Sequence, residues 1–276
     1  MGKDINRLAE WLADRRRLAV ISGAGCSTAS GIGDYRDDDG SWKRNPPLQM
    51  QDFVRDQATR RRYWARSMLG WPMMSRARPN GAHAALAAME ARGWLNGLIT
   101  QNVDGLHQAA GHRQVLDLHG RLAEVVCLEC DARYPRSAMQ QLLHRSNAFM
   151  QDAMASAAPD GDADIADDLD LSAFRVPDCR RCGGVLKPDV VFYGDSVPRT
   201  RVAEAYAVVD SAEALLVVGS SLMVFSSFRF CRRAQELGLP MAAVNRGVTR
   251  ADQWFDLKIE DDCARVLPAV LESMDG

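Results

Sequence analysis

Four cysteines stand in two pairs whose spacing suits a metal ion. Two residues separate Cys127 from Cys130, and two separate Cys179 from Cys182. This spacing lets both sulfur atoms of a pair reach one ion at about 2.3 Å. Two such pairs predict one tetrahedral zinc ion, and four thiolates leave no open position for a catalytic water. Two redox-active or disulfide-forming pairs are the alternative interpretation.

A glycine-rich turn follows a short apolar run near the start of the chain. Residues 18–21 are typical of a buried strand, and Gly23 and Gly25 come just after them. Glycines here let the backbone turn and approach a ligand closely, and backbone N–H groups there can bind phosphate. Thr28 stands where the dinucleotide fingerprint G-x-G-x-x-G has its third glycine. Taken alone, this segment therefore indicates a generic Rossmann-like turn rather than any particular class of enzyme.

Polar residues follow several other apolar runs. In open α/β sheets, ligands bind beyond the carboxyl ends of the strands, so these residues are candidates for one crevice. The alternative for each is structural: Asn and Asp-Gly make turns, and a single histidine is more often structural than catalytic. The polar segments are residues 101–105, 119–120, 219–221 and 245–247.

Strands that alternate with helical stretches predict a parallel, doubly wound sheet. After the cysteine region we expect a strand at residues 190–192 to resume that sheet. Residues 51–70 predict a helical side module that ends before Trp71 and Pro72, and residues 136–155 a helix between the cysteine pairs. His83 is interpreted as a packed or capping residue, and Cys26 as a small packing residue.

Composition limits the kinds of partner. The chain has 276 residues, 47% of them hydrophobic, and a net charge of −2. This balance gives no electrostatic case for nucleic acid or for an anionic membrane. No apolar run approaches the ~20 residues of a membrane span, and the first residues lack the apolar core of a signal peptide. We expect a cytoplasmic protein, in which seven cysteines serve as thiols or metal ligands.

Taken in order, these segments resemble those of the sirtuins over about residues 15–270. The resemblance implies NAD⁺-dependent removal of acyl groups from protein lysines. It also implies an α/β fold with a Rossmann-like large domain and a small zinc domain. The segments that carry it are residues 23–25, 34–36, 101–104, 119–120, the four cysteines, 190–195, 219–222 and 245–247.

With the resemblance, the expected domains can be bounded. The Rossmann-like domain comprises residues 1–43, 76–126 and 186–276. Residues 44–75 form the helical module at the acyl pocket, and residues 127–185 form the zinc-binding domain. Within the family the chain is similar to a branch with bacterial and mitochondrial members, because of the Gly-Trp-Pro segment at residues 70–72.

The resemblance also assigns roles. His119 matches the catalytic base, and Asn102 and Asp104 hold the nicotinamide and ribose. An imidazole with its ordinary pKa near 6.5 suits a base that deprotonates a ribose hydroxyl at neutral pH. The cofactor residues implied are Gly23, Ala24, Gly25, Asp34, Tyr35, Arg36, Gln101, Asn102, Asp104, Gly219, Ser220, Ser221, Asn245, Arg246, Gly247 and Cys263.

The acyl group is a separate question. Val191, Phe192, Tyr193 and Gly194 are assigned to the substrate side. Tyr63 and Arg66 resemble the Tyr-x-x-Arg of relatives that accept acidic acyl groups, and a guanidinium with a phenol suits a carboxylate. An exposed basic helix is the alternative, since three arginines precede Tyr63.

Three other functions stay open at this point. The same scaffold could transfer ADP-ribose to a protein. The chain could be a zinc-dependent binding module with a vestigial NAD site. It could also transfer hydride as a dehydrogenase, although the broken glycine fingerprint agrees better with NAD⁺ as a consumed co-substrate. The oligomeric state is not predicted.

Overall fold

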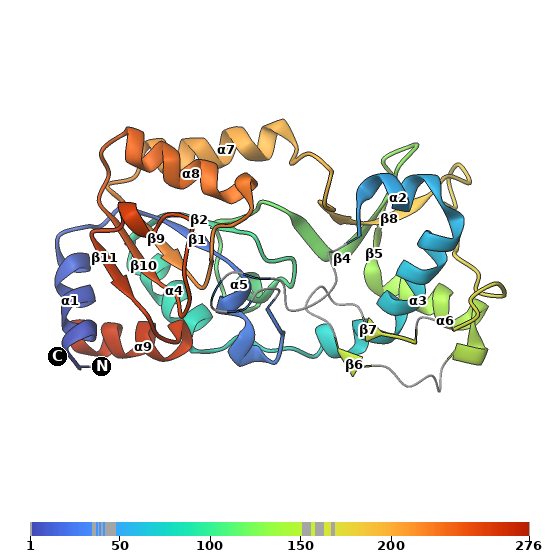
Figure 1. The fold of residues 1–276 in the computed structure, drawn as a ribbon, viewed down its shortest axis with the longest axis horizontal. Coiled ribbons are helices and arrows are strands. Elements are labelled where there is room, and N and C mark those ends of the chain that lie inside the picture. The colour runs from blue at the N-terminus through green and yellow to red at the C-terminus, as the bar shows by residue number, and fades with distance from the viewer. Residues whose placement is uncertain are drawn as a thin grey trace.

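The computed structural model describes residues 2–34, 37, 39, 41, 48–150, 156–157, 163–166 and 169–275. Tyr35 and Arg36, both expected at the cofactor site, lie outside the described residues. The described chain forms a large lobe and a small lobe, and its two ends lie close together on the large lobe (Figure 1). No described helix is long and apolar enough to cross a membrane.

A six-stranded sheet, parallel throughout, forms the centre of the large lobe. Its order, β11-β10-β9-β1-β2-β3, places β1 and β9 side by side in the middle. Every residue of these two strands is buried, as expected for parallel strands covered on both faces. From β1 the strands are added outward to β3, and from β9 they are added outward to β11 on the opposite side. The strand order therefore reverses between β1 and β9, and such sheets bind ligands at this point. The strands are β1 (Leu18–Ser22), β2 (Leu95–Thr100), β3 (Val115–Asp117), β9 (Ala214–Val218), β10 (Met241–Val244) and β11 (Leu257–Ile259).

Helices cover both faces of this sheet (Figure 1). Helices α1 (Gly2–Ala13), α4 (Gly81–Ala91) and α9 (Cys263–Asp275) pack on one face, where α9 contacts both others. Helices α7 (Arg199–Asp210) and α8 (Phe225–Glu236) pack on the other. Each face has its own buried cluster of apolar side chains. The predicted doubly wound sheet is therefore confirmed. Short turns of helix are η1 (Ala24–Cys26), η2 (Thr28–Ser30), α5 (Leu106–Ala109), η3 (Ala148–Met150) and η4 (Asp252–Trp254).

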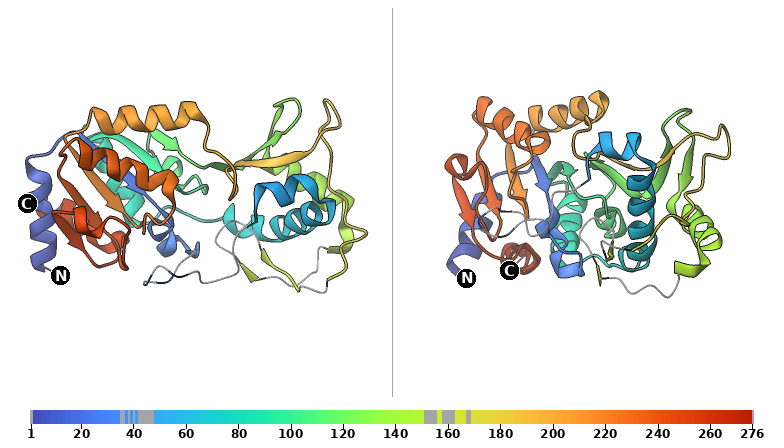
Figure 2. Two further views of the ribbon diagram at one scale, coloured as in Figure 1. Left: turned by 45° about the horizontal axis from the view of Figure 1, so that its top comes forward. Right: turned by 45° about the vertical axis from the view of Figure 1, so that its right-hand side comes forward.

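The small lobe is built around a second, antiparallel sheet of order β5-β4-β8 (Figure 2). Helices α2 and α3 share one apolar core with this sheet and with α6. The helical module and the cysteine region therefore pack as one body. The elements are α2 (Met50–Arg55), α3 (Gln57–Met74), β4 (Gly120–Cys127), β5 (Arg133–Pro135), α6 (Arg136–Ser146), β6 (Ser156–Ala157), β7 (Ala163–Asp164) and β8 (Leu186–Val190).

The strand expected at residues 190–192 is wrong in its bounds and in its sheet. The strand is β8, at Leu186–Val190, and it pairs antiparallel with β4 in the small lobe. The apolar character of Val190 and Phe192 is explained by their packing in a cluster with Ile32, Leu106 and Leu122 between the lobes, and not by a strand of the parallel sheet. The expected domain bounds stay a prediction. They assigned residues 120–126 of β4 and all of β8 to the large domain, whereas both strands belong to the sheet of the small lobe.

Two helix ends also differ from expectation. Helix α3 continues through Pro72 to Met74 rather than ending before Trp71. Proline has no N–H to donate to the carbonyl of Met68, four residues back, and Gln140 Nε2 donates to that oxygen instead, at 2.7 Å. Helix α6 ends at Ser146, because the Asn147 side chain donates to the carbonyl oxygens of residues 143 and 175, both at 2.9 Å.

Candidate active site

One large cavity, of about 1570 Å³, runs along the carboxyl ends of the parallel strands and between the two lobes. Its lining includes His119 and every expected cofactor residue that the structure describes. It also includes the six residues expected on the substrate side. The sequence-predicted set is thereby brought together from positions as distant as Gly23 and Cys263. The substrate-side residues that line it are Tyr63, Arg66, Val191, Phe192, Tyr193 and Gly194.

The glycine turn packs backbone against backbone at the end of β9. A Cβ built on Gly23 would lie 2.8 Å from the carbonyl oxygen of Gly219, and one on Gly25 would lie 3.0 Å from it. Gly25 N–H donates to that same oxygen at 2.9 Å. Gly219 itself has a φ of +58°, which favours glycine. In the dinucleotide fingerprint, the third glycine lets a long helix pack closely against a strand. Here the two short 3₁₀ turns η1 and η2 follow the glycine turn instead.

Amide and carboxylate side chains brace this turn from the end of β2. Asn102 Nδ2 donates to the carbonyl oxygen of Gly23 at 3.0 Å. Ser27 Oγ donates to Asp104 Oδ2 at 2.7 Å, and Leu106 N–H donates to Asp104 Oδ1 at 2.8 Å. Burial raises the pKa of Asp104 above its ordinary value, and these two hydrogen bonds oppose that rise. The segment and the turn therefore form one rigid wall of the cavity.

Gln101 links two further walls. Its Nε2 donates to Ser220 Oγ at 2.7 Å, and its Oε1 accepts from Ser227 Oγ at 2.8 Å. Ser220 follows β9, and Ser227 lies in the first turn of α8. The side chain of Gln101 thus fixes the ends of β2, β9 and α8 relative to one another.

His119 is held in one tautomer by its two neighbours. Its Nδ1 lies 3.1 Å from the carbonyl oxygen of Gln101, which can only accept, so Nδ1 carries the proton. The lone pair therefore stands on Nε2, and Ser226 Oγ donates to it at 2.8 Å. Burial lowers the pKa of His119 to about 4, against the ordinary value near 6.5 that we expected. The imidazole is neutral at pH 7 and has its lone pair on the nitrogen that Ser226 contacts.

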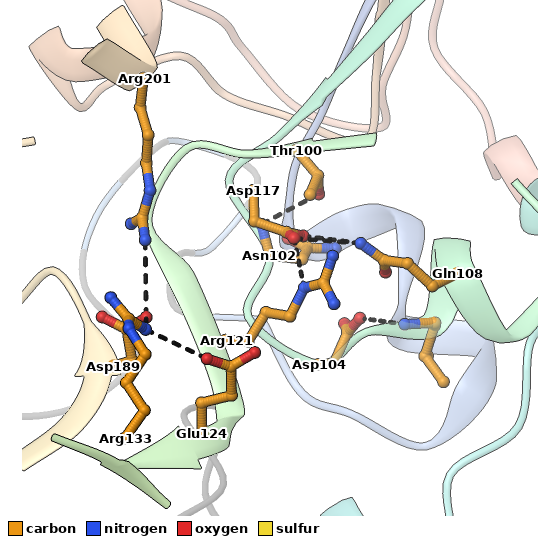
Figure 3. A network of polar contacts seen from close by, with 11 residues as sticks. Thr100, Asn102, Asp104, Gln108, Asp117, Arg121, Glu124, Arg133, Asp189 and Arg201 are labelled. Carbon is orange, nitrogen blue, oxygen red and sulfur yellow. Dashed lines mark hydrogen bonds and ion pairs between the residues drawn. The ribbon is translucent and has the colours of Figure 1, made fainter. Parts of the chain in front are cut away.

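Charged residues fix the strand turn on either side of His119 (Figure 3). Asp117 accepts from Arg121 Nε and from Gln108 Nε2, the latter at 2.9 Å. Asp189 pairs with Arg133, and with Arg201 at 3.6 Å, which ties β8 to β5 and to α7. Gly120 has a φ of +83°, and a Cβ there would lie 1.9 Å from the carbonyl oxygen of residue 189. The glycine after the histidine is therefore required by the packing of β4 on β8.

The substrate-side residues differ in their surroundings. Tyr63 is buried, and its ring contacts Phe53 and Phe192 edge-on at centroid distances of 5.5 and 5.2 Å. Arg66 Nε donates to the carbonyl oxygen of Ala163 at 3.0 Å. Both residues line the cavity, so the alternative interpretation, that they belong to an exposed basic helix, is wrong for them. Their recognition of an acidic acyl group stays a prediction.

One cavity residue, Ser226, was missed by the sequence reasoning, whereas a buried lysine of β8, Lys187, does not line the cavity. Lys187 is buried beneath Phe192, with Nζ 4.5 Å from its ring, and donates to the carbonyl oxygens of Pro188 and Val190. Burial lowers its pKa to about 8. Ser226 lies in the first turn of α8, five residues beyond the polar segment that follows β9. A hydroxyl so close to a predicted crevice is a weak signal, because serine is common at helix starts.

The four cysteines meet in the small lobe, outside the lining of the cavity. Their sulfur atoms all lie within 4.8 Å of one another, with Cys127 and Cys182 3.5 Å apart and Cys130 and Cys179 3.7 Å apart. Four sulfurs at about 2.3 Å from a tetrahedral zinc ion are about 3.8 Å apart. The donor set therefore fits zinc, and it leaves no position for a catalytic water.

A second group of donor atoms, Cys26, His83 and His107, is buried behind the glycine turn. His83 Nδ1 accepts from Asn80 N–H at 3.3 Å in the capping box that begins α4, so its Nε2 carries the proton and faces Cys26 Sγ at 4.0 Å. The lone pair of His83 is thus used by the helix cap. The predicted capping role of His83 and the packing role of Cys26 are confirmed.

The strand order, the cavity and the cysteine lobe together define a Rossmann-like α/β fold of the dinucleotide-binding class, with a small lobe whose four cysteines fit a metal ion. Comparison with known proteins narrows this class. The sequence model of the Sir2 family matches residues 23–226, which is most of the chain. The chain belongs to the Sir2, or sirtuin, family.

Relatives resemble the chain over nearly its whole length. A Bordetella bronchiseptica protein named NAD-dependent protein deacetylase is 55% identical, over 97% of each chain. The NAD-dependent protein deacetylase 3 of Pseudomonas syringae is 47% identical, over 98% of this chain and 96% of that protein. Among solved structures, a Sir2 enzyme superposes with a TM-score of 0.78 at 34% identity, over 100% of this chain and 99% of that one. A Sir2 structure with a p53 peptide and NAD⁺ has a TM-score of 0.78 at 27% identity, over 98% of each chain.

Proposed function

We propose that this sirtuin removes acyl groups from lysine side chains of proteins and consumes NAD⁺, releasing nicotinamide and O-acyl-ADP-ribose. One observation carries the proposal. His119 and all the described cofactor residues line a single cavity, with the substrate-side residues on the same lining. The names of the relatives and the solved Sir2 complexes with NAD⁺ and with acetylated peptide support it.

The walls of the cavity suggest how the dinucleotide lies. Residues 23–25 and Asp34 approach its backbone, and Gln101, Asn102 and Asp104 hold the nicotinamide and its ribose. Residues 219–221 and 245–247, together with Cys263, contact the far half. The close packing of Gly25 on Gly219 supports this arrangement, because it brings the backbones of the two glycine segments side by side on the cavity wall.

The chemistry then follows from the residue types. Nicotinamide leaves C1′ of the ribose while the acyl oxygen attacks, and the cationic character of this step is favoured by positioning and by exclusion of water. A ribose hydroxyl must next lose its proton in order to attack the acyl carbon. His119 is the base, because its lone pair is on Nε2 and burial keeps it unprotonated at pH 7.

The acyl preference is proposed from the small-lobe wall. Arg66 and Tyr63 both reach the cavity lining, so a succinyl or glutaryl group would meet a guanidinium and a phenol there. The Gly-Trp-Pro segment supports placement in the branch with bacterial and mitochondrial members. Zinc, held by the four cysteines, has a structural role in this account. A thiol cluster of this kind favours a reducing compartment, which supports a cytoplasmic location.

A panel of acyl-lysine peptides tests the proposal. The purified protein is incubated with NAD⁺ and acetyl, succinyl, glutaryl and branched acyl peptides, and nicotinamide is quantified with the deacylated peptide. Equal amounts of both products on at least one peptide are expected. Label from NAD⁺ on a protein without any acyl peptide would favour ADP-ribosyl transfer, and formation of NADH would favour a dehydrogenase. No nicotinamide from any peptide would contradict the proposal.

A further inference from the structure

The lone pair through which His119 would act as a base is already occupied. Nδ1 carries the proton because it faces the carbonyl oxygen of Gln101 at 3.1 Å. Nε2 therefore accepts, and the atom 2.8 Å from it is Ser226 Oγ, which must donate its hydrogen. A ribose hydroxyl that approached Nε2 directly would have to displace this short hydrogen bond.

The Ser226 oxygen is placed to take the proton itself. Ser226 and His119 both line the cavity. A hydroxyl that donates its only hydrogen keeps two lone pairs, so it can accept from a second hydroxyl at the same time. Gln101 secures the arrangement from both sides, since its carbonyl oxygen holds His119 and its side chain accepts from Ser227, the neighbour of Ser226.

We propose that Ser226 relays the proton from the ribose hydroxyl to His119, an inference that rests on the proposed deacylase function. The O–H bond of the ribose breaks as a new O–H bond forms on Ser226 Oγ. The original O–H bond of Ser226 breaks as the N–H bond forms on His119 Nε2. The ribose oxygen keeps the electron pair with which it attacks the acyl carbon. One proton moves in total from the ribose to the imidazole, and Ser226 ends as a neutral hydroxyl.

The relay acts after nicotinamide has left, and this separates it from a purely structural role. Ser226→Ala keeps a good helix former in the half-buried first turn of α8 and removes only the hydroxyl. We expect it to lower the formation of deacylated peptide by about tenfold or more, within the range of acid–base contributions. Exchange of labelled nicotinamide into NAD⁺, which reports the earlier step, should stay within about twofold of the wild-type rate.

Two more variants sharpen the test. Ser226→Thr retains a hydroxyl and should recover most of the lost rate. Ser227→Ala is the matched neighbour, because it removes the hydrogen bond to Gln101 and leaves the contact with Nε2. It should slow nicotinamide exchange and product formation together. In mixtures of H₂O and D₂O, single-turnover product formation should depend on the deuterium fraction in a curved manner in the wild type, for two protons in motion, and linearly in Ser226→Ala.

The outcomes are distinct. Wild-type rates of product formation in Ser226→Ala would overturn the relay, and so would equal losses of exchange and product formation in that variant. A linear solvent dependence in the wild type would also overturn it, in favour of direct transfer to Nε2. Each of these results would leave the deacylase function standing. Absence of nicotinamide exchange in the wild-type protein would instead overturn the proposed function itself, and the relay with it.

Discussion

The two lobes of the molecule differ in the interactions that stabilise each of them. The large lobe has a parallel sheet whose central strands β1 and β9 are buried throughout, with helices on both faces. The small lobe has a three-stranded sheet, a core shared with α2 and α3, and a cluster of four cysteines. Apolar side chains are buried on both faces of the sheet in the large lobe, whereas the small lobe is a small body of the kind that a metal stabilises.

In the proposed function, the same division separates the residues assigned to the chemistry from those assigned to the selection of substrate. His119, Ser226 and the glycine turn belong to segments that the parallel sheet positions. Tyr63 and Arg66 come from α3, which packs with the cysteine lobe. A reaction on an invariant dinucleotide needs rigid walls, and a variable acyl group can be met by the lobe on the other side of the cavity.

The largest expected effect is on the chemical step. His119→Gln removes the base and should lower turnover by at least about 100-fold. The zinc content should not change, because His119 is not part of the cysteine cluster. The measurement is the initial rate of deacylated peptide formation. His144→Gln, in α6 of the small lobe and outside the cavity lining, is the matched control and should retain the wild-type rate. Comparable losses in both variants would break the assignment of the chemistry to the large lobe.

Removal of the metal should affect the lobes unequally. Structural zinc contributes about 10–16 kcal/mol in small zinc domains, which is similar to the whole stability of a typical domain. We expect Cys182→Ser, or a strong chelator, to raise hydrogen exchange in β4, β5 and α6 while β1 and β9 stay protected. Zinc analysis should give one ion per wild-type chain and also per chain of Cys231→Ser, whose cysteine is buried in α8. A small lobe that stays protected without metal would contradict this prediction.

Acid should destabilise the large lobe through its buried imidazoles. Burial lowers the pKa of His83 to about 4, whereas an unfolded chain has the ordinary value of 6.5. Below pH 6.5 the unfolded chain therefore binds a proton that the folded chain does not take up until about pH 4. The free energy of unfolding should fall over this window, by roughly 1.6 kcal/mol between pH 6.5 and 5 from this residue.

Urea unfolding at pH 7 and pH 5 measures this dependence. His83→Gln, which cannot be protonated in this range, should show a smaller difference between the two pH values, although its stability at pH 7 is lower. An unchanged difference would assign the acid sensitivity to other groups.

The smallest expected effect is on acyl preference. Arg66→Met should reduce kcat/KM for succinyl or glutaryl peptides about tenfold more than for acetyl peptides, because a carboxylate loses a charged partner. Arg62→Met is the matched control. Arg62 lies one turn earlier in α3, also lines the cavity, and donates to the carbonyl oxygens of residues 165 and 166. It should change both activities alike. Equal loss on both kinds of peptide in Arg66→Met would make Arg66 a structural residue.

The motifs in the sequence predicted most of the fold, and every described residue that they assigned to the cofactor or the substrate lies on the cavity lining. Strands of the parallel sheet are predictable because each is a short apolar run that ends in glycine or polar residues. The four cysteines are predictable because their spacing is itself the geometry of a metal site. By contrast, Val190 and Phe192 have the same apolar character as a buried strand but pack between the lobes.

Other features depend on partners that are distant in the chain. Pro72 stays within α3 only because Gln140 replaces its missing hydrogen bond. The pKa of His119 depends on burial among residues distant in the chain, and its tautomer depends on the carbonyl oxygen of Gln101. Local sequence carries no record of these contacts, so it predicts a helix that ends before Trp71 and Pro72 and a histidine with an ordinary pKa.

A crystal structure with NAD⁺ and an acyl-lysine peptide, obtained under conditions of slow turnover, would show where the dinucleotide and the acyl group lie. We expect one dinucleotide along the carboxyl ends of the parallel strands, between the glycine turn and residues 219–221. We also expect a hydroxyl of the nicotinamide ribose within hydrogen-bond distance of Ser226 Oγ or His119 Nε2. A dinucleotide bound elsewhere, or a ribose that faces away from both of these atoms, would contradict this arrangement.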